Sequence, residues 1–539
     1  MKMLYRSLLE MVVLLFMGIP FVSGLSQALC QSTQNVFHNP ILTGFNPDPS
    51  ICRVNDDYYM VTSSFTWYPG IPVYHSKDLV NWEIIGYALD RPDMINMNGL
   101  DDNDGIWAVT IRYYDGVFYL ITTANKCGGN FYMTARNPKG PWSNPVWLKD
   151  APGIDASLFW DGNGKCYYTG NTWDFKSQWP AQCAIWMQEL NLVEGKLIGK
   201  RRFLTYGHAG NAMYTEGPHI YKINGKYLLL TTEGGTGYNH AVTVHHSDSL
   251  WGPYTADKVN PVLTHRHLGS NYSIQNVGHA DLVKTRNGDW YAVTLGIRKV
   301  NGYAPLGRET FLCKVEFEND TPIFNPGYGI VLSEQKRPGL PWTPFKNEIM
   351  RDDFTSDKLG NVWSFVRIPQ KQFYSLSKGN LVLTLQSEVV DSLVSSAMII
   401  QKVKHHCYTA TTKFHFVTEK DNEQAGLILY RTANGYYSLM KDKNGIVLVC
   451  KNLGVKSEIK RMPYNASDVY LRAIVKDMDI SFFFGQSADS MIGIGGTLSL
   501  DAISDNEFNK FNGPGIGVYA TSNGKQSHNR VVYDWFDLE

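Results

Sequence analysis

Short runs of alternating apolar and polar residues, each bounded by Gly, Asn or Asp, fill the chain before residue 345. This period of two is typical of half-buried β-strands, and long stretches of helical periodicity are nearly absent. Five hairpin-like segments resemble one another: NDDYYMVTS (55–63), YDGVFYLIT (114–122), GNGKCYYTG (162–170), INGKYLLLT (223–231) and RNGDWYAVT (286–294). Asn-Gly and Asp-Gly are favoured in hairpin loops because their residues accept positive φ. The pattern predicts antiparallel β-structure.

The five turns recur along the chain at similar intervals. Their second turn residues are Asp57, Gly116, Gly164, Gly225 and Gly288, so the successive spacings are 59, 48, 61 and 63 residues. A β-meander repeated with this period is typical of propeller blades. The sequence therefore predicts an all-β fold that begins with a five-bladed β-propeller over residues 36–345.

The residue nine positions before each of these turns is ionisable or aromatic. The five residues are Asp48, Trp107, Asp155, Glu216 and His279. Taken singly, each has a common structural explanation, as a turn former, a core aromatic, a solvated carboxylate or a hydrogen-bonded imidazole. The shared offset favours a functional explanation, because it marks the start of the innermost strand in every blade. We expect these side chains to converge at the mouth of the central channel.

Three clustered carboxylates repel one another, so at least one must have a raised pKa and stay protonated near neutral pH. A protonated carboxylic acid beside an ionised one is the arrangement that breaks a glycosidic bond. Metal binding is the rival use of such a cluster. The eight cysteines form no CxxC pair, and one His with scattered carboxylates is a poor zinc set. Calcium held largely through water, with His279 nearby, is the remaining metal alternative, and no cofactor is required.

The bulk composition narrows the class of partner. The chain of 539 residues carries 50 basic and 50 acidic side chains, so it has no electrostatic footprint for nucleic acid. Aromatic residues reach 13% of the chain, which suits both β-structure and stacking on sugars. The composition therefore favours a carbohydrate partner and argues against a nucleic-acid one.

The N-terminus has the pattern of a secretory signal peptide over residues 1–28. Lys2 and Arg6 precede the apolar run MVVLLFMGIPFV (11–22), and small residues follow it. The run is too short to span a membrane, and no other segment of the sequence is long and apolar enough to do so. A lipoprotein anchor at Cys30 is less favoured, because the preceding Leu29 is bulky. We expect a secreted or periplasmic protein.

The last third of the chain has a different composition. A Pro-rich linker, PGLPWTPF (338–345), is followed by alternating runs such as NLVLTLQS (380–387), AGLILYRTANGYYSLMKD (425–442), DVYLRAIVKD (468–477) and GIGVYATS (515–522). The runs predict a β-sandwich over residues 350–539.

Seven motifs together resemble glycoside hydrolase family 43, in its β-xylosidase and α-L-arabinofuranosidase branch. They are FNPDPSI (45–51), SSFTWYPGIPVYHSKDLVNW (63–82), GIWAVTIRYYDGVFYLIT (105–122), GIDASLFWDGNGK (153–165), YTEGPHIYKINGKYLL (214–229), GHADLV (278–283) and PLGRETF (305–311). The resemblance implies a five-bladed propeller that cleaves glycosides with inversion. It also implies that Asp48 is the general base, Glu216 the general acid, and Asp155 the residue that tunes and positions the acid.

The same resemblance implies further contacts to the terminal sugar. Arg308 matches an arginine that contacts the sugar, Trp107 and Phe65 match aromatic walls, and His279 matches an axial His near a bound metal or water. The chain departs from its relatives at Val109 and Ala156, where they commonly have Pro, and at Thr66, where they often have an acidic residue. We expect the first two to be backbone adjustments, and Thr66 with Trp67 to lie near the sugar and affect its choice.

The implied activity is exo-acting hydrolysis that releases terminal β-D-xylose, α-L-arabinofuranose or both from xylan-type oligosaccharides. Arabinofuranosidase as the main activity is one alternative. A carbohydrate-binding propeller without catalysis is another, but it gives no reason for three intact carboxylates. The sandwich resembles the concanavalin-like domain of these enzymes, which can lend a loop to the active-site rim. A purely stabilising role and a separate carbohydrate-binding role are the other two options.

Overall fold

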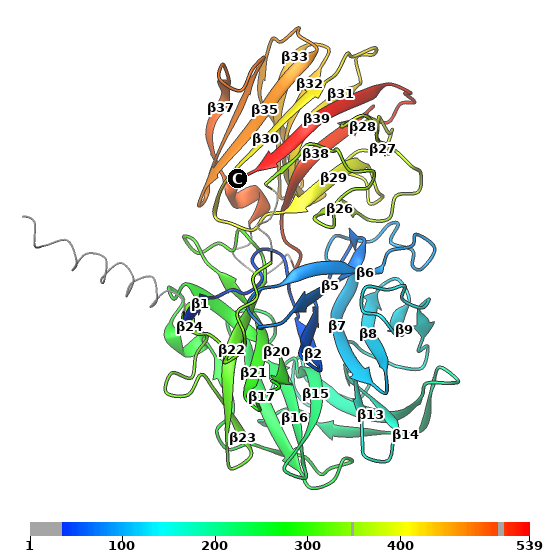
Figure 1. The fold of residues 1–539 in the computed structure, drawn as a ribbon, viewed down its shortest axis with the longest axis vertical. Coiled ribbons are helices and arrows are strands. Elements are labelled where there is room, and N and C mark those ends of the chain that lie inside the picture. Colours follow the sequence, from blue (N-terminus) through cyan, green and yellow to red (C-terminus); the bar gives the residue numbers. More distant parts are fainter. Residues whose placement is uncertain (1–34, 346–349, 505–510) are drawn as a thin grey trace, which may run out of the picture.

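The computed structural model describes residues 35–345, 350–504 and 511–539. A β-sandwich is stacked on a β-propeller (Figure 1), as the alternating pattern predicted. Within the described ranges the helical elements are two short 3-10 turns, η1 (Arg266–Leu268) and η2 (Leu500–Ile503). None of the helices in these ranges has the length and apolar character needed to traverse a membrane. The expected signal peptide lies outside the described residues.

Five antiparallel sheets form the blades of the propeller, and each is ordered along the chain. Blades 1 and 2 contain β2 (Ser50–Val54), β3 (Asp57–Val61), β5 (Gly70–Ser76), β6 (Glu83–Leu89), β7 (Gly105–Tyr114), β8 (Val117–Asn125), β9 (Gly129–Ala135) and β10 (Val146–Trp147). Blade 3 contains β11 (Ser157–Trp160), β12 (Cys166–Thr172), β13 (Ala184–Asn191) and β14 (Lys196–Thr205). Blades 4 and 5 contain β15 (Glu216–Ile223), β16 (Lys226–Glu233), β17 (Ala241–Ser247), β18 (Thr255–Ala256), β19 (Leu263–Thr264), β20 (Ile274–Lys284), β21 (Trp290–Arg298), β22 (Glu309–Glu318) and β23 (Thr321–Phe324).

The hairpin turns have the positive φ values that the sequence predicted. Asp115 and Gly116 have φ of 47° and 77°, and Asn224 and Gly225 have φ of 51° and 84°. Two consecutive positive φ values match the right-handed twist of the flanking strands, which is why Asn-Gly and Asp-Gly are favoured there. The turns therefore fix the register of the two innermost strands, β7 with β8 and β15 with β16.

The propeller is closed by pairing between its two ends. β1 (Val36–His38) pairs antiparallel with β24 (Glu334–Lys336), and Leu42 forms a bridge with Thr310 of β22. Asn39 adds hydrogen bonds from its side-chain nitrogen to the carbonyls of Leu312 and Leu332, each 2.9 Å long. The start of the chain is thereby tied to the last blade, which holds blades 1 and 5 side by side.

Two sheets pack face to face in the C-terminal domain. One contains β27 (Tyr374–Leu376), β28 (Leu381–Thr384), β39 (Arg530–Leu538), β30 (Cys407–His415), β35 (Asp468–Lys476), β36 (Asp479–Gly485) and β37 (Ile492–Ser499), with β25 (Arg351–Asp352) added on β39. The other contains β34 (Val455–Met462), β33 (Gly445–Asn452), β32 (Gly435–Asp442), β31 (Gln424–Thr432), β38 (Gly515–Thr521), β29 (Ala397–Lys402) and β26 (Trp363–Val366). Alternate residues of the long strands fill the core between the sheets.

The two domains share a sheet edge and a buried polar cluster. The short strand β4 (Trp67–Tyr68) of the propeller pairs with β26 of the sandwich. Asp102, in the loop before blade 2, accepts hydrogen bonds from Arg367, Tyr430 and the backbone N–H of Ala433. All of these groups are buried, and parting the domains would remove all three of these hydrogen-bond donors from Asp102. The interface therefore holds the sandwich in one position over the propeller.

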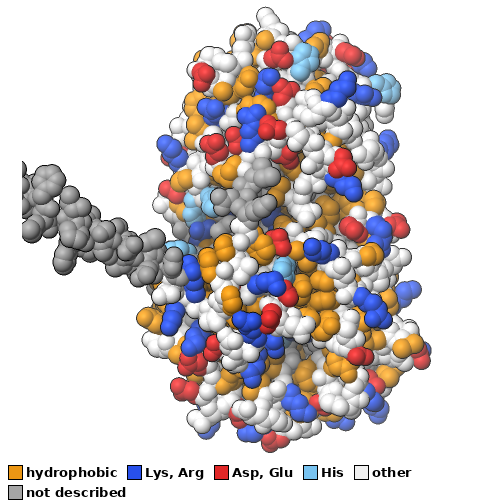
Figure 2. Space-filling model, viewed as in Figure 1, with side chains coloured by type: hydrophobic (Ala, Val, Ile, Leu, Met, Phe, Trp, Pro, Cys, Tyr) orange, Lys and Arg blue, Asp and Glu red, His pale blue; other side chains and the backbone are white. Residues whose placement is uncertain are grey.

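Basic and acidic side chains are interspersed over the face of the molecule seen in Figure 2. This agrees with the equal numbers of basic and acidic residues in the sequence. The visible face carries no patch of a single charge sign that would attract a polyanion.

Candidate active site

Each blade has a residue in the left-handed backbone region either just before its innermost strand or within the first six residues of that strand. These residues are Asp48, Ala108, Asp155, Gly217 and His279, with φ of 53°, 43°, 56°, 56° and 53°. A non-glycine residue adopts this conformation at a cost of about 1–2 kcal/mol, so the surrounding structure must hold it there. The backbone makes the same bend in all five blades at the end of the channel where the predicted residues lie.

A cavity of about 690 Å³ opens at this end of the propeller. All seven residues expected from the sequence line it: Asp48, Phe65, Trp107, Asp155, Glu216, His279 and Arg308. They come from all five blades, so only the closed propeller brings them together. Asp48, Asp155 and His279 are themselves the left-handed residues, whereas Trp107 and Glu216 each precede one.

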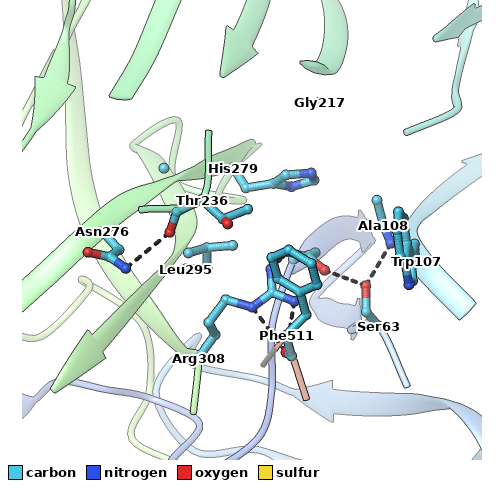
Figure 3. A network of polar contacts seen from close by, with 12 residues as sticks. Ser63, Trp107, Ala108, Gly217, Thr236, Asn276, His279, Leu295, Arg308 and Phe511 are labelled. Atoms are coloured by element: carbon cyan, nitrogen blue, oxygen red, sulfur yellow. Dashed lines mark hydrogen bonds and ion pairs between the residues drawn. The ribbon is translucent and has the colours of Figure 1, made fainter. Parts of the chain in front are cut away.

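Asp48 is held as an ionised carboxylate. Arg308 donates from Nη1 to Oδ1 of Asp48 at 2.8 Å, and the Ser63 hydroxyl donates to Oδ2 at 2.6 Å. Ser63 also accepts a hydrogen bond from the backbone N–H of Ala108 (Figure 3), which fixes its hydroxyl. Burial acts to raise the pKa of Asp48, but the charges of Arg308 and His279 and the Ser63 hydrogen bond outweigh it and lower the pKa.

Glu216 has the opposite electrostatic environment. Burial and the negative charge of Asp155 raise the pKa of Glu216 to about 8, although the positive charges of His279 and Arg308 oppose the rise. The side chain is only partly exposed to solvent, through the cavity. At neutral pH Glu216 is therefore protonated while Asp48 is ionised, which is the division of roles that acid–base hydrolysis requires.

Asp155 links the segment that carries Glu216 to His279 of the next blade. Its Oδ2 accepts a hydrogen bond from the backbone N–H of Gly217, 3.1 Å away, and lies 3.6 Å from Nε2 of His279. Burial acts to lower the pKa of His279, but Asp155 and the other carboxylates raise it to about 9. The imidazolium and the Gly217 N–H together hold Asp155 next to Glu216, where its charge favours the protonated acid.

Gly217 fits this contact because it has no side chain. A Cβ at this position would lie 3.2 Å from Nε2 of His279, and the residue has a positive φ. Both constraints disfavour any other residue, so the glycine after Glu216 allows the close approach of blades 4 and 5.

Aromatic rings and one arginine form the wall nearest the sandwich. The Arg308 guanidinium lies 5.4 Å from the ring centroid of Phe65 and 5.6 Å from that of Phe511. It donates to the carbonyl of Phe511 from Nη2 at 3.0 Å and from Nε at 3.3 Å. The Trp107 and Phe511 rings are 6.2 Å apart, and the Trp107 indole donates to the carbonyl of Asn103. The sandwich thus supplies one wall of the cavity, as the first of the three expectations for this domain stated.

Phe511 and Ser63 are site residues that the sequence reasoning did not single out. Phe511 lies 203 residues after Arg308 and far from any propeller motif, so no local pattern identifies it. Ser63 stands at the end of the first hairpin run, and its position next to β3 was visible in the sequence. Its role needed the neighbouring blade to be placed, because the hydroxyl acts between blades 1 and 2.

The three sequence departures, Val109, Ala156 and Thr66, are all buried, as is Trp67, which follows Thr66. Ala156 and Val109 are buried beside the left-handed positions of blades 3 and 2. Thr66 and Trp67 are also buried, and neither is among the described residues that line the cavity. Thr66 directly follows the cavity-lining Phe65, and Trp67 belongs to the same buried cluster as Phe65, so their effect on the choice of sugar stays a prediction. Trp67 packs against Phe45, with ring centroids 5.8 Å apart, under the shared sheet edge.

The side chains around His279 offer few ligands for calcium. Among the described residues no three His, Cys, Asp or Glu side chains converge as a group of metal ligands. Nδ1 of His279 is buried and has no hydrogen-bond partner within the described chain, but a single imidazole nitrogen is a poor donor for a hard cation. The side chains alone do not fit a calcium cage, and a cation at His279 would need water for the rest of its shell.

Comparison with known proteins gives the family. Residues 37–322 match the family model described as glycosyl hydrolases family 43. The chain belongs to this family. Residues 351–539 match a second model, described as the beta xylosidase C-terminal concanavalin A-like domain. The family 43 resemblance that the seven motifs indicated is confirmed, and the chain is a glycosidase.

Relatives match nearly the whole enzyme. A xylosidase/arabinosidase of Butyrivibrio fibrisolvens is 38% identical over 520 residues, which cover 94% of this chain and 99% of the relative. A non-reducing end alpha-L-arabinofuranosidase of Bacteroides ovatus is also 38% identical, over 96% of this chain and 97% of its own length. The crystal structure of a xylan beta-1,4-xylosidase from Bacillus halodurans superimposes with a TM-score of 0.88 at 33% identity, covering 93% of this chain and all of the other.

Proposed function

We propose that the enzyme is an exo-acting, inverting glycosidase that releases a terminal pentose, β-D-xylose or α-L-arabinofuranose, from xylan-type oligosaccharides. The observation that carries the proposal is the pairing, in one cavity, of Asp48 with a lowered pKa and Glu216 with a pKa of about 8. The names of the relatives support the choice of sugars, since they include both xylosidases and an arabinofuranosidase.

In the proposed reaction, Asp48 accepts a proton from a water molecule as the water oxygen attacks the anomeric carbon. Glu216 donates its proton to the glycosidic oxygen, and the bond between that oxygen and the anomeric carbon breaks. After the reaction Asp48 holds the proton from water and Glu216 is ionised, so exchange of one proton with solvent at each group restores the starting state. For inversion the two carboxyl groups should lie roughly 6.5–9.5 Å apart, which leaves room for the water.

Asp155 and His279 are positioning residues in this scheme. Asp155 keeps Glu216 protonated through its charge, and His279 holds Asp155 in place. Arg308 keeps Asp48 ionised and presents nitrogen donors at the same wall as the rings of Phe65 and Trp107. Such a combination of a charged donor and apolar ring faces suits a sugar, which has hydroxyl edges and apolar faces.

Exo action follows from the closed wall of the cavity. Phe511 of the sandwich packs against Trp107 and Arg308 on the side formed by blades 5, 1 and 2, which supports entry of a glycan by its end. We also propose that residues 1–28 direct export, which would place the enzyme where plant polysaccharide fragments occur.

The test is hydrolysis of nitrophenyl β-D-xylopyranoside and nitrophenyl α-L-arabinofuranoside by the purified mature protein and its Glu216→Gln variant. Activity on either substrate that is lost in the variant supports the proposal, and the better substrate identifies the preferred pentose. Absence of activity on both, with the protein folded and with binding of xylo-oligosaccharides intact, would favour the non-catalytic binding propeller instead.

A further inference from the structure

Blade 3 carries a set of exposed aromatic side chains next to the cavity. Trp173 follows β12, lines the cavity and is 58% exposed. The ring of Phe175, two residues later, lies 5.8 Å from that of Phe203 and 5.4 Å from that of Tyr206. Phe203 and Tyr206 are 5.7 Å apart and are 38% and 41% exposed. Phe175, Phe203 and Tyr206 are called the outer aromatic track below.

Strand direction places this track on the same face of the propeller as the cavity. β11 begins at the cavity, beside Asp155, and β12 returns antiparallel to it. β13 runs away again and β14 returns. Residues that follow β12 or end β14 therefore lie on the cavity face. Since β14 is the outermost strand of the blade, the aromatic residues extend from the cavity wall to the rim of the propeller.

The track also lies on the side of the cavity opposite Arg308. Blades 5, 1 and 2 form the wall that contains Arg308, Phe65 and Trp107, and Phe511 closes that wall. Blades 3 and 4 form the opposite wall in a five-bladed ring, with Trp173, Ser177 and Tyr214 lining it. A glycan whose terminal sugar is held at Arg308 and that extends towards the opposite wall passes over blades 3 and 4, where Trp173 stands two residues before Phe175 of the track.

Loop anchoring is the simpler explanation for the packing of the three rings, because Phe175 holds its loop against Phe203 and Tyr206. Loop anchoring alone favours burial of the apolar surface, yet two of the rings keep more than a third of their surface exposed. Arg201 adds a polar group beside the track. Its guanidinium lies 5.8 Å from the Phe203 ring centroid and pairs with Asp174 at 3.0 Å. Exposed ring faces next to a hydrogen-bond donor are better suited to bind a chain of sugars than to bind a partner protein.

We propose that the outer aromatic track binds the leaving-group side of a linear, neutral pentose oligosaccharide, several residues beyond the bond that is cleaved. The proposal rests on the proposed function and deepens it. It assigns the enzyme to oligosaccharides longer than a disaccharide, because the first leaving-group sugar would reach only as far as the cavity wall at Trp173.

The experiment compares kcat/KM for three classes of substrate: a nitrophenyl pentoside, a disaccharide, and oligosaccharides of four to six residues. Both the β-1,4-xylo and the α-1,5-arabino series are used. The variants are Phe203→Ala, Tyr206→Ala and the double variant. Tyr113→Ala is the matched control, because Tyr113 is 39% exposed but lies near the far end of β7, on the opposite face.

We expect the Phe203 and Tyr206 variants to lower kcat/KM for the long oligosaccharides about fivefold to tenfold. The nitrophenyl pentoside, the disaccharide and the control variant should be unaffected.

Three results would overturn the inference while the proposed function stands. One is a wild-type kcat/KM that does not rise from disaccharide to hexasaccharide. Another is an equal loss on all substrates in the track variants, which would indicate loop anchoring alone. The third is cleavage of the nitrophenyl pentoside with neither oligosaccharide series cleaved. Lack of activity on every glycoside would instead contradict the proposed function itself.

Discussion

Arg308 donates one hydrogen bond to the carboxylate of Asp48, 2.8 Å away, and uses its other nitrogens to bind the carbonyl of Phe511. A single guanidinium therefore connects the proposed base in blade 1 with the sandwich loop that closes the cavity. The electrostatics of the base and the shape of the cavity depend on the same side chain.

Replacing Arg308 should shift the acid limb of the plot of kcat/KM against pH. The Arg308 charge lowers the pKa of Asp48, so Arg308→Met should raise that pKa and move the acid limb to higher pH. Arg308→Lys is the matched variant, since it keeps the charge but cannot bind Asp48 and Phe511 together. We expect both variants to lose about 100-fold or more in kcat/KM, but only Arg308→Met to shift the limb. If the acid limb of Arg308→Met stays at the pH of the native enzyme, a group other than Asp48 determines that limb.

Replacing Asp155 should shift the alkaline limb in the opposite direction. The Asp155 charge helps to raise the pKa of Glu216 to about 8, so Asp155→Asn should lower it and move the alkaline limb to lower pH. His279→Gln removes a positive charge that opposes the rise, and should move the same limb to higher pH. Profiles of kcat/KM for one nitrophenyl pentoside measure both shifts. Shifts of the same sign in the two variants would contradict this account of the acid.

Gly217→Ala should impair catalysis more than it impairs stability. The added Cβ would lie 3.2 Å from Nε2 of His279, on a residue with φ of +56°, and would push on the Asp155–His279 contact. Gly225→Ala is the control, because its φ is +84° but a Cβ there meets no atom within 4 Å. Both should lose about 1 kcal/mol of stability from backbone strain. Only Gly217→Ala should lose kcat, by about tenfold or more. Equal losses of kcat in Gly217→Ala and Gly225→Ala would contradict a role of the Asp155–His279 contact in catalysis.

A buried ionic cluster in the propeller channel should dominate the stability of the ring. Asp281 of blade 5 accepts hydrogen bonds from Arg112 of blade 2 at 2.7 Å, from Ser50 at 2.6 Å and from Tyr221. Removing one partner of such a buried pair costs about 3–5 kcal/mol, so Asp281→Ala should lower Tm by several degrees. The exposed pair of Lys443 and Asp421 is the control, and Lys443→Ala should leave Tm unchanged.

The pH dependence of stability follows from the same cluster. Burial acts to raise the pKa of Asp281, but Arg112 outweighs it and the folded pKa is lowered. The contribution of Asp281 is therefore present above the unfolded pKa of about 3.9 and is lost as pH falls towards the folded value. Thermal unfolding between pH 3 and 7 should show a steeper loss below pH 4 in the native protein than in Asp281→Ala.

The sequence predicted the blades well because their hairpin turns are local. Asn224-Gly225 and Asp115-Gly116 determine their own φ values, and the spacing between turns needs no tertiary information. The nine-residue offset selected five residues that all line the cavity. Asp48, Asp155 and His279 occupy the left-handed position themselves, whereas Trp107 and Glu216 precede it, and the offset alone does not separate these two cases.

Contacts between distant parts of the chain set the limits of the sequence reasoning. Trp67 was expected near the sugar because its neighbours in the sequence are site residues. Its place under the domain interface follows from the pairing of β4 with β26, nearly 300 residues later, which no local pattern predicts. Phe511 was missed for the same reason, since only the docked sandwich brings it to Arg308 and Trp107. The pKa of Glu216 likewise depends on burial and on Asp155 of another blade.

The most direct test of the account is proton NMR of the first sugar released from a pentoside of known anomeric configuration. Attack by water that Asp48 activates, with Glu216 as the acid, predicts a product of the opposite configuration: α-xylose from a β-xyloside, or β-arabinofuranose from an α-arabinofuranoside. Initial release of the sugar with its configuration retained would contradict the account, because it would require a carboxylate to attack the anomeric carbon in place of water.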